Sequence, residues 1–202
     1  IHHSGLLSYD NIATLQLSSP HELLSSLNLK SNMPLILATY HPIPRDPERT
    51  KYESKNFFEA LNLASTFSNI IITSPNHDNG RKVILYEINK LTHLPNVIHI
   101  DSLGANRYYS LMSHSQSVPV IVAGNSSSII KEAPFFMAHS LNVGDRQSGR
   151  TSASSQVDVS ADKELIFKAL KKLCSQTCSI PLNPYFKKGA SENLKDFILK
   201  TI

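Results

Sequence analysis

The chain is organised around the segment Val120-Ile121-Val122-Ala123-Gly124-Asn125-Ser126-Ser127-Ser128-Ile129-Ile130-Lys131-Glu132-Ala133-Pro134. Its apolar start predicts a buried strand that ends at Gly124, and the following residues predict a helix whose first turn consists of serines. A strand that turns directly into a helix leaves the first helical amides without partners. These amides, the positive end of the helix dipole and the serine hydroxyls together predict an anion site. An ordinary polar turn with a capping serine would give the same pattern, and the segment alone favours that ordinary turn, because short motifs often match by chance.

Glu132 lies about one turn beyond these serines, which is too far along to cap the helix. A carboxylate accepts hydrogen bonds from hydroxyl groups, so it suits the hydroxyls of a sugar beside a bound diphosphate. A charged side chain inside an apolar helix is otherwise costly to bury, and this favours a functional role. The segment therefore predicts a diphosphate site with Glu132 next to it.

The composition is that of a soluble globular protein. The 202 residues are enough for one domain with a hydrophobic core, and 41% hydrophobic with 18% charged residues argues against disorder. The formal charge of +4 suits an anionic small ligand, whereas no basic run interleaved with aromatic residues indicates nucleic acid. No apolar run approaches the roughly 20 residues of a membrane span.

Two cysteines, Cys174 and Cys178, lie four positions apart in a helical pattern. They lack the further ligands of a metal site and are too few for a disulfide scaffold, so we expect reduced thiols in a cytoplasmic protein. The sequence opens at Ile1 without a Met or a signal peptide, and we interpret it as a fragment.

Short apolar runs alternate with helical patterns along the chain. Strands are predicted at 34–40, 69–73, 97–100, 119–123 and 140–144, with a weaker sixth strand at 156–159. Helices are predicted at about 50–67, 80–92, 104–114, 161–174 and 189–201. This alternation indicates a parallel sheet covered on both faces, which is a doubly wound, Rossmann-like α/β fold.

Ligands of such sheets bind beyond the carboxyl ends of the strands. At these ends the sequence places His41, the loop from Pro75 to Gly80, Asp101-Ser102-Leu103, the serine turn and the loop from Asp145 to Arg150. The polar chemistry of the chain therefore converges on one rim of the sheet. This convergence favours the ligand site over an ordinary polar turn.

Two motifs on this rim are Gly124-Asn125-Ser126-Ser127-Ser128-Ile129-Ile130-Lys131-Glu132-Ala133-Pro134 and Asn142-Val143-Gly144-Asp145-Arg146-Gln147-Ser148-Gly149-Arg150. Other segments follow in a matching order: Asp10-Asn11-Ile12, Thr39-Tyr40-His41-Pro42, Thr73-Ser74-Pro75-Asn76-His77-Asp78-Asn79-Gly80, Asn183-Pro184-Tyr185 and Gly189-Ala190-Ser191. Together they resemble the UDP-N-acetylglucosamine 2-epimerases, and most closely the hydrolysing branch, which serves the synthesis of sialic-acid-type sugars. Ile129 departs from the Gly of many hydrolysing members, and residues 151–160 fit the family poorly.

The family has two Rossmann-like domains in the glycosyltransferase-B (GT-B) arrangement, with the substrate between them. The resemblance implies that this chain is the carboxyl-terminal half: an approach or hinge segment at 1–33, a nucleotide-binding domain at 34–188 and a C-terminal helix at 189–202. It implies that the amino-terminal half, with its acidic catalytic residues, is absent and that the isolated fragment is inactive. A homodimer of the intact enzyme is a further expectation.

The resemblance also implies which residues bind UDP. Ser126 and Ser127 would hold the diphosphate together with backbone amides, and Ser128 is a further candidate. Glu132 would accept hydrogen bonds from the two ribose hydroxyls. Backbone groups of the loop that ends at Leu103 would bind the edge of the uracil.

His41 matches the active-site histidine of the family, where an imidazole works as an acid, a base or a diphosphate contact. A loop histidine without a ligand is the alternative. Arg146 and Arg150 would counter the phosphate charge or fix the serine turn from behind; Arg146 is the stronger candidate, since Arg150 also fits a surface residue. Asn76 and Asp78 contact the ligand or are simple turn residues.

The family's reaction is an elimination followed by a hydration. A base removes the proton at C2 of the sugar as UDP leaves C1, and water then adds to the glycal to give free N-acetylmannosamine or a diacetamido analogue. The serine turn would stabilise the charge on the departing UDP. The resemblance implies no metal and no cofactor. Two alternatives stay open, a nucleotide-sugar domain of a GT-B glycosyltransferase and a non-catalytic module that senses UDP-sugars.

Overall fold

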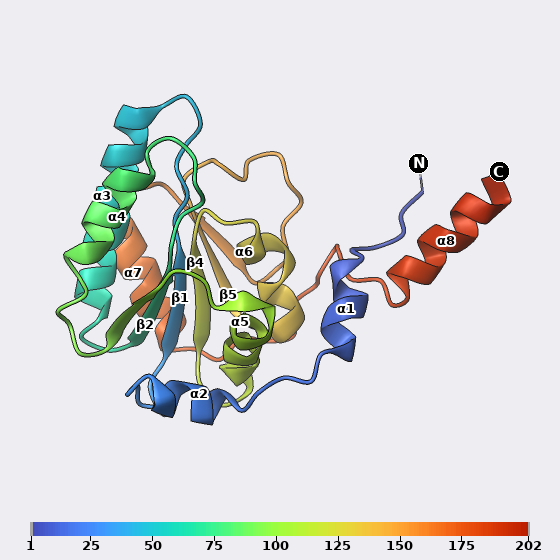
Figure 1. The fold of residues 1–202 in the computed structure, drawn as a ribbon, viewed down its shortest axis with the longest axis horizontal. Helices are drawn as coiled ribbons and strands as arrows, with labels where there is room; N and C mark the ends of the chain where they lie inside the picture. The colour runs from blue at the N-terminus through green and yellow to red at the C-terminus, as the bar shows by residue number, and fades with distance from the viewer. Residues whose placement is uncertain (1, 202) are drawn as a thin grey trace.

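The computed structural model describes residues 2–201 (Figure 1); positions 1 and 202, the outer ends of the predicted segments 1–33 and 189–202, lie outside this range. A parallel sheet of six strands runs through the middle, in the order β3-β2-β1-β4-β5-β6. Its strands are β1 (Leu35–Thr39), β2 (Asn69–Thr73), β3 (Val97–Ile100), β4 (Val120–Gly124), β5 (His139–Val143) and β6 (Gln156–Val159). The order reverses between β1 and β4, which confirms the predicted doubly wound α/β fold and its sixth strand.

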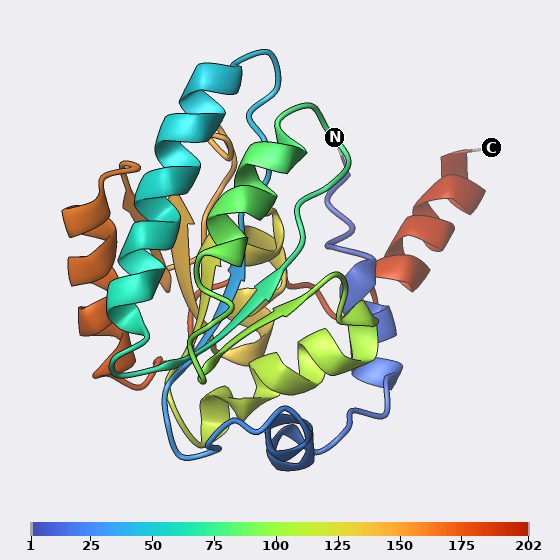
Figure 2. The same ribbon diagram turned by 60° about the vertical axis from the view of Figure 1, so that its left-hand side comes forward.

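Helices cover both faces of the sheet, as the uninterrupted apolar strands require. One face carries α3 (Pro47–Ala64), α4 (Arg81–Asn89) and α7 (Lys163–Cys174), and Figure 2 shows α3 and α4 side by side over it. The other face carries α2 (Pro20–Ser26), α5 (Gly104–Ser113) and the 3-10 helix η2 (Ala133–Phe136). A second 3-10 helix, η1 (His114–Gln116), follows α5 directly. Alternate residues of β1 enter the two cores, with Ile36 on the first face and Leu35 on the second.

Capping residues set the starts of two long helices. The Asp46 carboxylate accepts the amide hydrogen of Arg49 at 2.9 Å, so α3 begins at Pro47 rather than near residue 50. Asp162 accepts the amide of Leu165 at 3.0 Å in the same way, and α7 begins at residue 163 rather than 161. Both differences arise because a capping carboxylate ends the preceding loop.

The helix predicted after the serine turn is much shorter than expected. It is the single turn α6 (Ser128–Lys131), followed by η2. Pro134 has no amide hydrogen to donate to Ile130, so the α-helix cannot continue and a 3-10 turn replaces it. Glu132 therefore lies at the junction of α6 and η2, not inside an apolar helix, and the dipole of one turn contributes little to an anion site.

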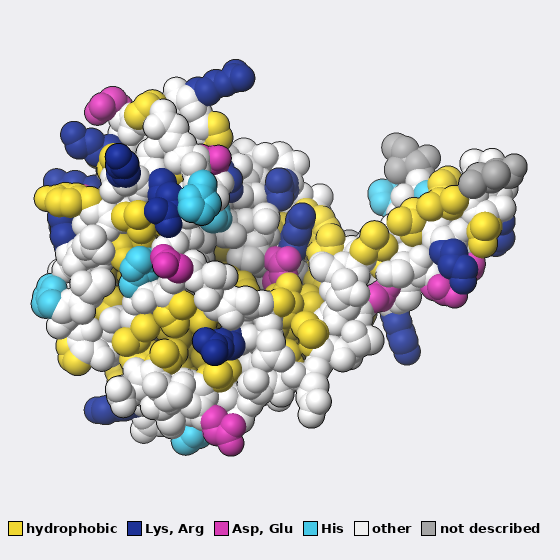
Figure 3. Space-filling view, in the orientation of Figure 1, with side chains coloured by type: hydrophobic (Ala, Val, Ile, Leu, Met, Phe, Trp, Pro, Cys, Tyr) yellow, Lys and Arg dark blue, Asp and Glu magenta, His cyan; other side chains and the backbone are white. Residues whose placement is uncertain are grey.

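The two ends of the chain meet beside the second face. There α1 (Ser8–Thr14) packs its Tyr9 and Ile12 into the core, and α8 (Ala190–Thr201) projects away from the domain (Figure 1). Figure 3 shows hydrophobic side chains along this projecting helix. One of its exposed hydrophobic residues is Phe197, of which 42% is accessible. Within residues 2–201 no helix is both long and apolar enough to cross a membrane.

Candidate functional site

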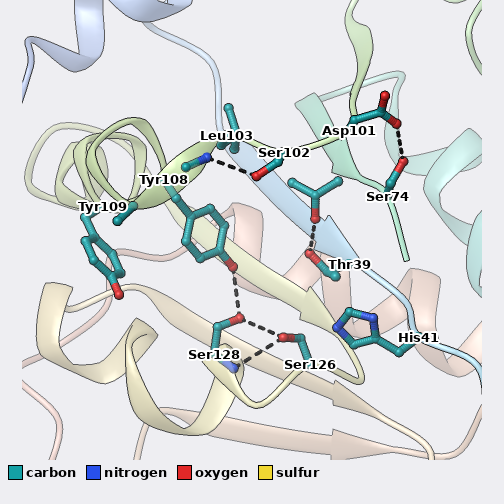
Figure 4. Close-up of a pocket in the computed structure, with 13 residues that line it drawn as sticks. Thr39, His41, Ser74, Asp101, Ser102, Leu103, Tyr108, Tyr109, Ser126 and Ser128 are labelled. Atoms are coloured by element: carbon teal, nitrogen blue, oxygen red, sulfur yellow. Dashed lines mark hydrogen bonds between the residues drawn. The ribbon is translucent and has the colours of Figure 1, made fainter. Parts of the chain in front are cut away.

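A pocket of about 400 Å³ opens at the carboxyl ends of the central strands, where the strand order reverses (Figure 4). Its lining comes from the ends of β1 and β2, the loop after β3, the start of α5 and the serine turn. Four of the residues predicted for the site line this pocket: His41, Leu103, Ser126 and Ser128. The rim predicted from the sequence is therefore where the structure has a cavity.

The close approach of β4 to β1 depends on Gly124. This residue pairs with Thr39 in the sheet register and has a φ of +127°, and a Cβ atom there would lie 1.9 Å from the Thr39 carbonyl oxygen. Glycine is therefore required at this position. The next amide, of Asn125, donates to the same carbonyl oxygen at 3.2 Å, so the serine turn starts directly against the end of β1.

Asn125 connects three parts of the rim, a role that was not predicted from the sequence. Its fully buried side chain accepts the backbone amide hydrogen of His41 at 2.7 Å and donates to the His41 carbonyl at 2.9 Å. Its own carbonyl accepts hydrogen bonds from Arg146 at 3.1 Å and from Gln147 at 2.7 Å. One buried asparagine thus joins the loop after β1, the serine turn and the loop after β5.

The His41 ring faces the pocket in its neutral form. Burial, assisted by the charge of Arg146 and opposed by Asp78, lowers the pKa of His41 to about 4. The backbone amide of Asn76 donates to Nδ1 at 3.2 Å, so the proton of the neutral ring lies on Nε2. At neutral pH the ring can donate a hydrogen bond from Nε2 without carrying a charge.

The hydroxyls of the serine turn form a chain of hydrogen bonds with a tyrosine from α5. Tyr108 lies 3.0 Å from the Ser128 hydroxyl, and this hydroxyl donates to that of Ser126 at 3.2 Å (Figure 4). Tyr108 was not among the predicted site residues. Ser127, which was predicted to hold the diphosphate, makes no capping hydrogen bond and is not part of the pocket lining within residues 2–201.

Glu132 follows the serine turn at the end of α6 and, within residues 2–201, is not among the residues that line the pocket. Burial raises the pKa of its carboxyl group, and its buried Oε2 has no hydrogen-bond partner among the described residues. Burial first, and the charge of Glu132 second, raise the pKa of Tyr109, which lines the pocket. A buried acceptor normally has a partner, so Oε2 has capacity for a donor from a ligand or from water.

The remaining predicted residues lie around the mouth or behind the turn. Arg146 holds the carbonyl of Asn125, which corresponds to the predicted contact from behind the serine turn, and the side chain of Arg150 is exposed. Asn76 donates to the Asp78 carboxylate at 2.5 Å, an internal bond of their loop. No cluster of three or more His, Cys, Asp or Glu side chains in the described chain is arranged to hold a metal ion.

A six-stranded parallel sheet in this order, with a pocket at its switch point, defines the class: a doubly wound α/β domain with a cavity at the rim. The chain belongs to the UDP-N-acetylglucosamine 2-epimerase family, whose sequence model matches residues 1–199. The family resemblance seen in the sequence is therefore confirmed.

Comparison with known proteins shows what share of a family member's length the chain covers. It is 32% identical to the GDP/UDP-N,N'-diacetylbacillosamine 2-epimerase (hydrolyzing) of Campylobacter jejuni, over 76% of this chain and 39% of that protein. It is 30% identical to the UDP-N-acetylglucosamine 2-epimerase of Neisseria meningitidis, over 69% of this chain and 35% of that protein. The S. aureus MnaA–UDP co-structure matches with a TM-score of 0.68 at 17% identity, covering 98% of this chain and 53% of the other. The matched region spans about half or less of each relative.

Proposed function

We propose that this chain binds the UDP part of a UDP-sugar, as the nucleotide-binding half of a hydrolysing UDP-N-acetylglucosamine 2-epimerase. The observation that carries the proposal is the pocket at the switch point, where the serine hydroxyls and the neutral His41 ring meet. The solved S. aureus protein, which shares the fold, is described as a complex with UDP. A nucleotide diphosphate is an anion that such neutral donors can bind.

Each group then has a defined task. The Ser126 hydroxyl and the backbone amides of the turn would hold the diphosphate, with Ser127 at the edge of the turn and Ser128 in contact with Ser126. The unpartnered oxygen of Glu132 would accept the ribose hydroxyls, and the loop that ends at Leu103 would bind the uracil. Arg146 would keep the turn in place through Asn125.

His41 would donate from Nε2 to the oxygen of the departing diphosphate. Negative charge grows on UDP as the bond to C1 of the sugar breaks, and donors already in place stabilise that charge in the transition state. The approach of the diphosphate also raises the pKa of the ring, so a larger fraction of His41 is protonated once the substrate is bound. The base that removes the C2 proton would come from the other half of the enzyme.

The hydrolysing reaction is favoured by two relatives, the C. jejuni protein and one from Legionella pneumophila, whose names both include "hydrolyzing". The N. meningitidis relative is named as a 2-epimerase without that word. The products formed by a longer protein that contains this chain distinguish the outcomes: free sugar with UDP supports hydrolysis, whereas a C2 epimer still attached to UDP contradicts it. Transfer of the sugar to an acceptor would indicate the glycosyltransferase alternative, and binding without turnover would indicate a sensing module.

The architecture of the longer protein is part of this proposal. Residues 34–188 would form the nucleotide-binding domain, and residues 1–33 with 189–202 would form the connection to the other half. The Asp10 carboxylate accepts the amide of Ser191 at 2.7 Å, which holds the amino-terminal segment against the start of α8. The exposed apolar side chains of α8, with 67% of Leu199 accessible, are suited to pack against that half.

Isothermal calorimetry with UDP tests the binding step. We expect this chain to bind UDP and the variant Glu132→Gln to bind about tenfold to a hundredfold more weakly, since hydrogen bonds to charged groups contribute about 1.5–3 kcal/mol. Glu164→Gln is the matched control, because this glutamate is exposed on α7, and it should leave the affinity unchanged. Absence of binding at millimolar UDP would overturn the proposal.

A further inference from the structure

The hydroxyl of Tyr108 meets the serine turn from the opposite wall of the pocket. Tyr108 belongs to α5, whereas Ser128 begins α6, and their hydroxyl oxygens lie 3.0 Å apart (Figure 4). The neighbouring Tyr109 also lines the pocket, but its hydroxyl is not part of this chain of hydrogen bonds. The two adjacent tyrosines thus differ in one contact.

The direction of each proton in the chain follows from counting donors and acceptors. A hydroxyl has one proton to donate and two lone pairs to accept. The Ser126 oxygen accepts twice, from the Ser128 amide at 3.4 Å and from the Ser128 hydroxyl at 3.2 Å. With both lone pairs occupied, the Ser126 hydroxyl has only its own proton left for a ligand.

Tyr108 supplies the start of this chain. Because the Ser128 proton is directed to Ser126, the Ser128 oxygen is the acceptor and the Tyr108 hydroxyl is the donor. Burial is the main cause of a raised pKa for Tyr108, so the phenol keeps its proton throughout the neutral range. The order is therefore Tyr108 to Ser128 to Ser126, with a free proton at the end that lines the pocket.

We propose that Tyr108 is a positioning residue, which directs the Ser126 proton into the pocket as a fixed donor to the diphosphate of a bound nucleotide. This inference rests on the proposed UDP binding and adds a residue to it. A donor that is already aimed needs no reorganisation when the anion arrives. Without the phenol hydroxyl, Ser128 can turn its proton elsewhere and the Ser126 hydroxyl can rotate away.

Removal of the hydroxyl alone separates this role from packing of the ring. Tyr108→Phe keeps the ring against the pocket, and Tyr86→Phe, at an exposed tyrosine on α4 outside the pocket lining, is the matched control. UDP and uridine are the two probes, since uridine has the same base and ribose but no diphosphate. Affinities are measured by ligand-observed NMR, and urea unfolding verifies that each variant is folded.

We expect Tyr108→Phe to weaken the affinity for UDP about threefold to tenfold, which corresponds to the loss of one hydrogen bond. The affinity for uridine should change by no more than about twofold. Tyr86→Phe should change neither affinity by more than about twofold. Because Tyr108 acts through Ser128, the double variant with Ser128→Ala should bind UDP no more weakly than Ser128→Ala alone.

Three results would overturn the inference while UDP binding by the unmodified chain stands. These are an unchanged UDP affinity in Tyr108→Phe, an equal loss for uridine and UDP, and additive losses in the double variant. An equal loss of affinity for both probes would mean that the Tyr108 hydroxyl acts on the nucleoside rather than on the diphosphate. If the unmodified chain does not bind UDP, the proposed function fails and the inference fails with it.

Discussion

Replacement of Asn125 by Ala is the sharpest test of how the rim is built. The substitution removes two hydrogen bonds, of 2.7 and 2.9 Å, from a side chain with 0% exposure, and leaves the amide and carbonyl of His41 without these partners. Each buried group left unpaired costs about 1–3 kcal/mol, so the free energy of unfolding should fall by about 2–6 kcal/mol. Small domains typically have about 5–15 kcal/mol in total, so the variant should be marginal but foldable at low temperature.

UDP affinity should fall as well, because His41 is no longer held at the end of β1. The assays are urea unfolding for stability and calorimetry with UDP at a temperature where the variant is folded. Asn96→Ala is the control: its side chain donates to the carbonyls of Ser65 and Ser68 at 2.6 Å each, at the opposite end of the sheet. This control should lose stability without losing UDP affinity.

A loss of less than about 1 kcal/mol in Asn125→Ala would refute the reasoning, because an unpaired buried group costs at least that much. A normal UDP affinity in the folded variant would also refute it, since the position of His41 would then be set by other contacts. Equal losses of affinity in both variants would show that stability, not geometry, controls binding.

Two further predictions concern His41 and Gly124. The His41 ring should titrate near pH 4 in an NMR titration, and a midpoint near 6.5 would contradict the role of burial. The free energy of unfolding should decrease as the pH falls from about 6.5 towards 4, because the unfolded chain takes up the proton at a higher pH than the folded chain does. Gly124→Ala should prevent folding, because the added Cβ would lie 1.9 Å from a carbonyl oxygen. Gly149→Ala is the control: it has a φ of +82°, but its added Cβ would meet no atom within 4 Å, so urea unfolding should show a loss of only about 1–2 kcal/mol.

The fold was predictable because its strands are continuous apolar runs separated by helical patterns. All residues of β1 and β4 are buried, and such strands occur where helices cover both faces. Local sequence also limited the prediction. A helix end at Pro134 can be predicted from the sequence. The serines at the start and the apolar pair Ile129-Ile130 nevertheless favoured a longer helix than the single turn of α6.

The pocket residues at strand ends could be placed from the sequence because the carboxyl ends of parallel strands share one rim. Asn125 and Tyr108 could not, since their roles depend on partners that only the tertiary structure brings near. Asn125 is separated from His41 by 84 positions, and Tyr108 from Ser128 by 20. The one signal in the sequence was an asparagine directly after an apolar strand.

The arrangement of charge at the rim suits a site that must release a leaving group. The groups that the serine turn and His41 present to the pocket are neutral donors, namely serine hydroxyls and an imidazole whose pKa is lowered to about 4, while the Asp101 carboxylate also lines the pocket. The cation of Arg146 stays behind the turn and acts through the carbonyl of Asn125. Neutral donors that are already aimed gain strength as charge develops on the departing diphosphate, so under the proposed function this geometry favours the transition state over the bound substrate.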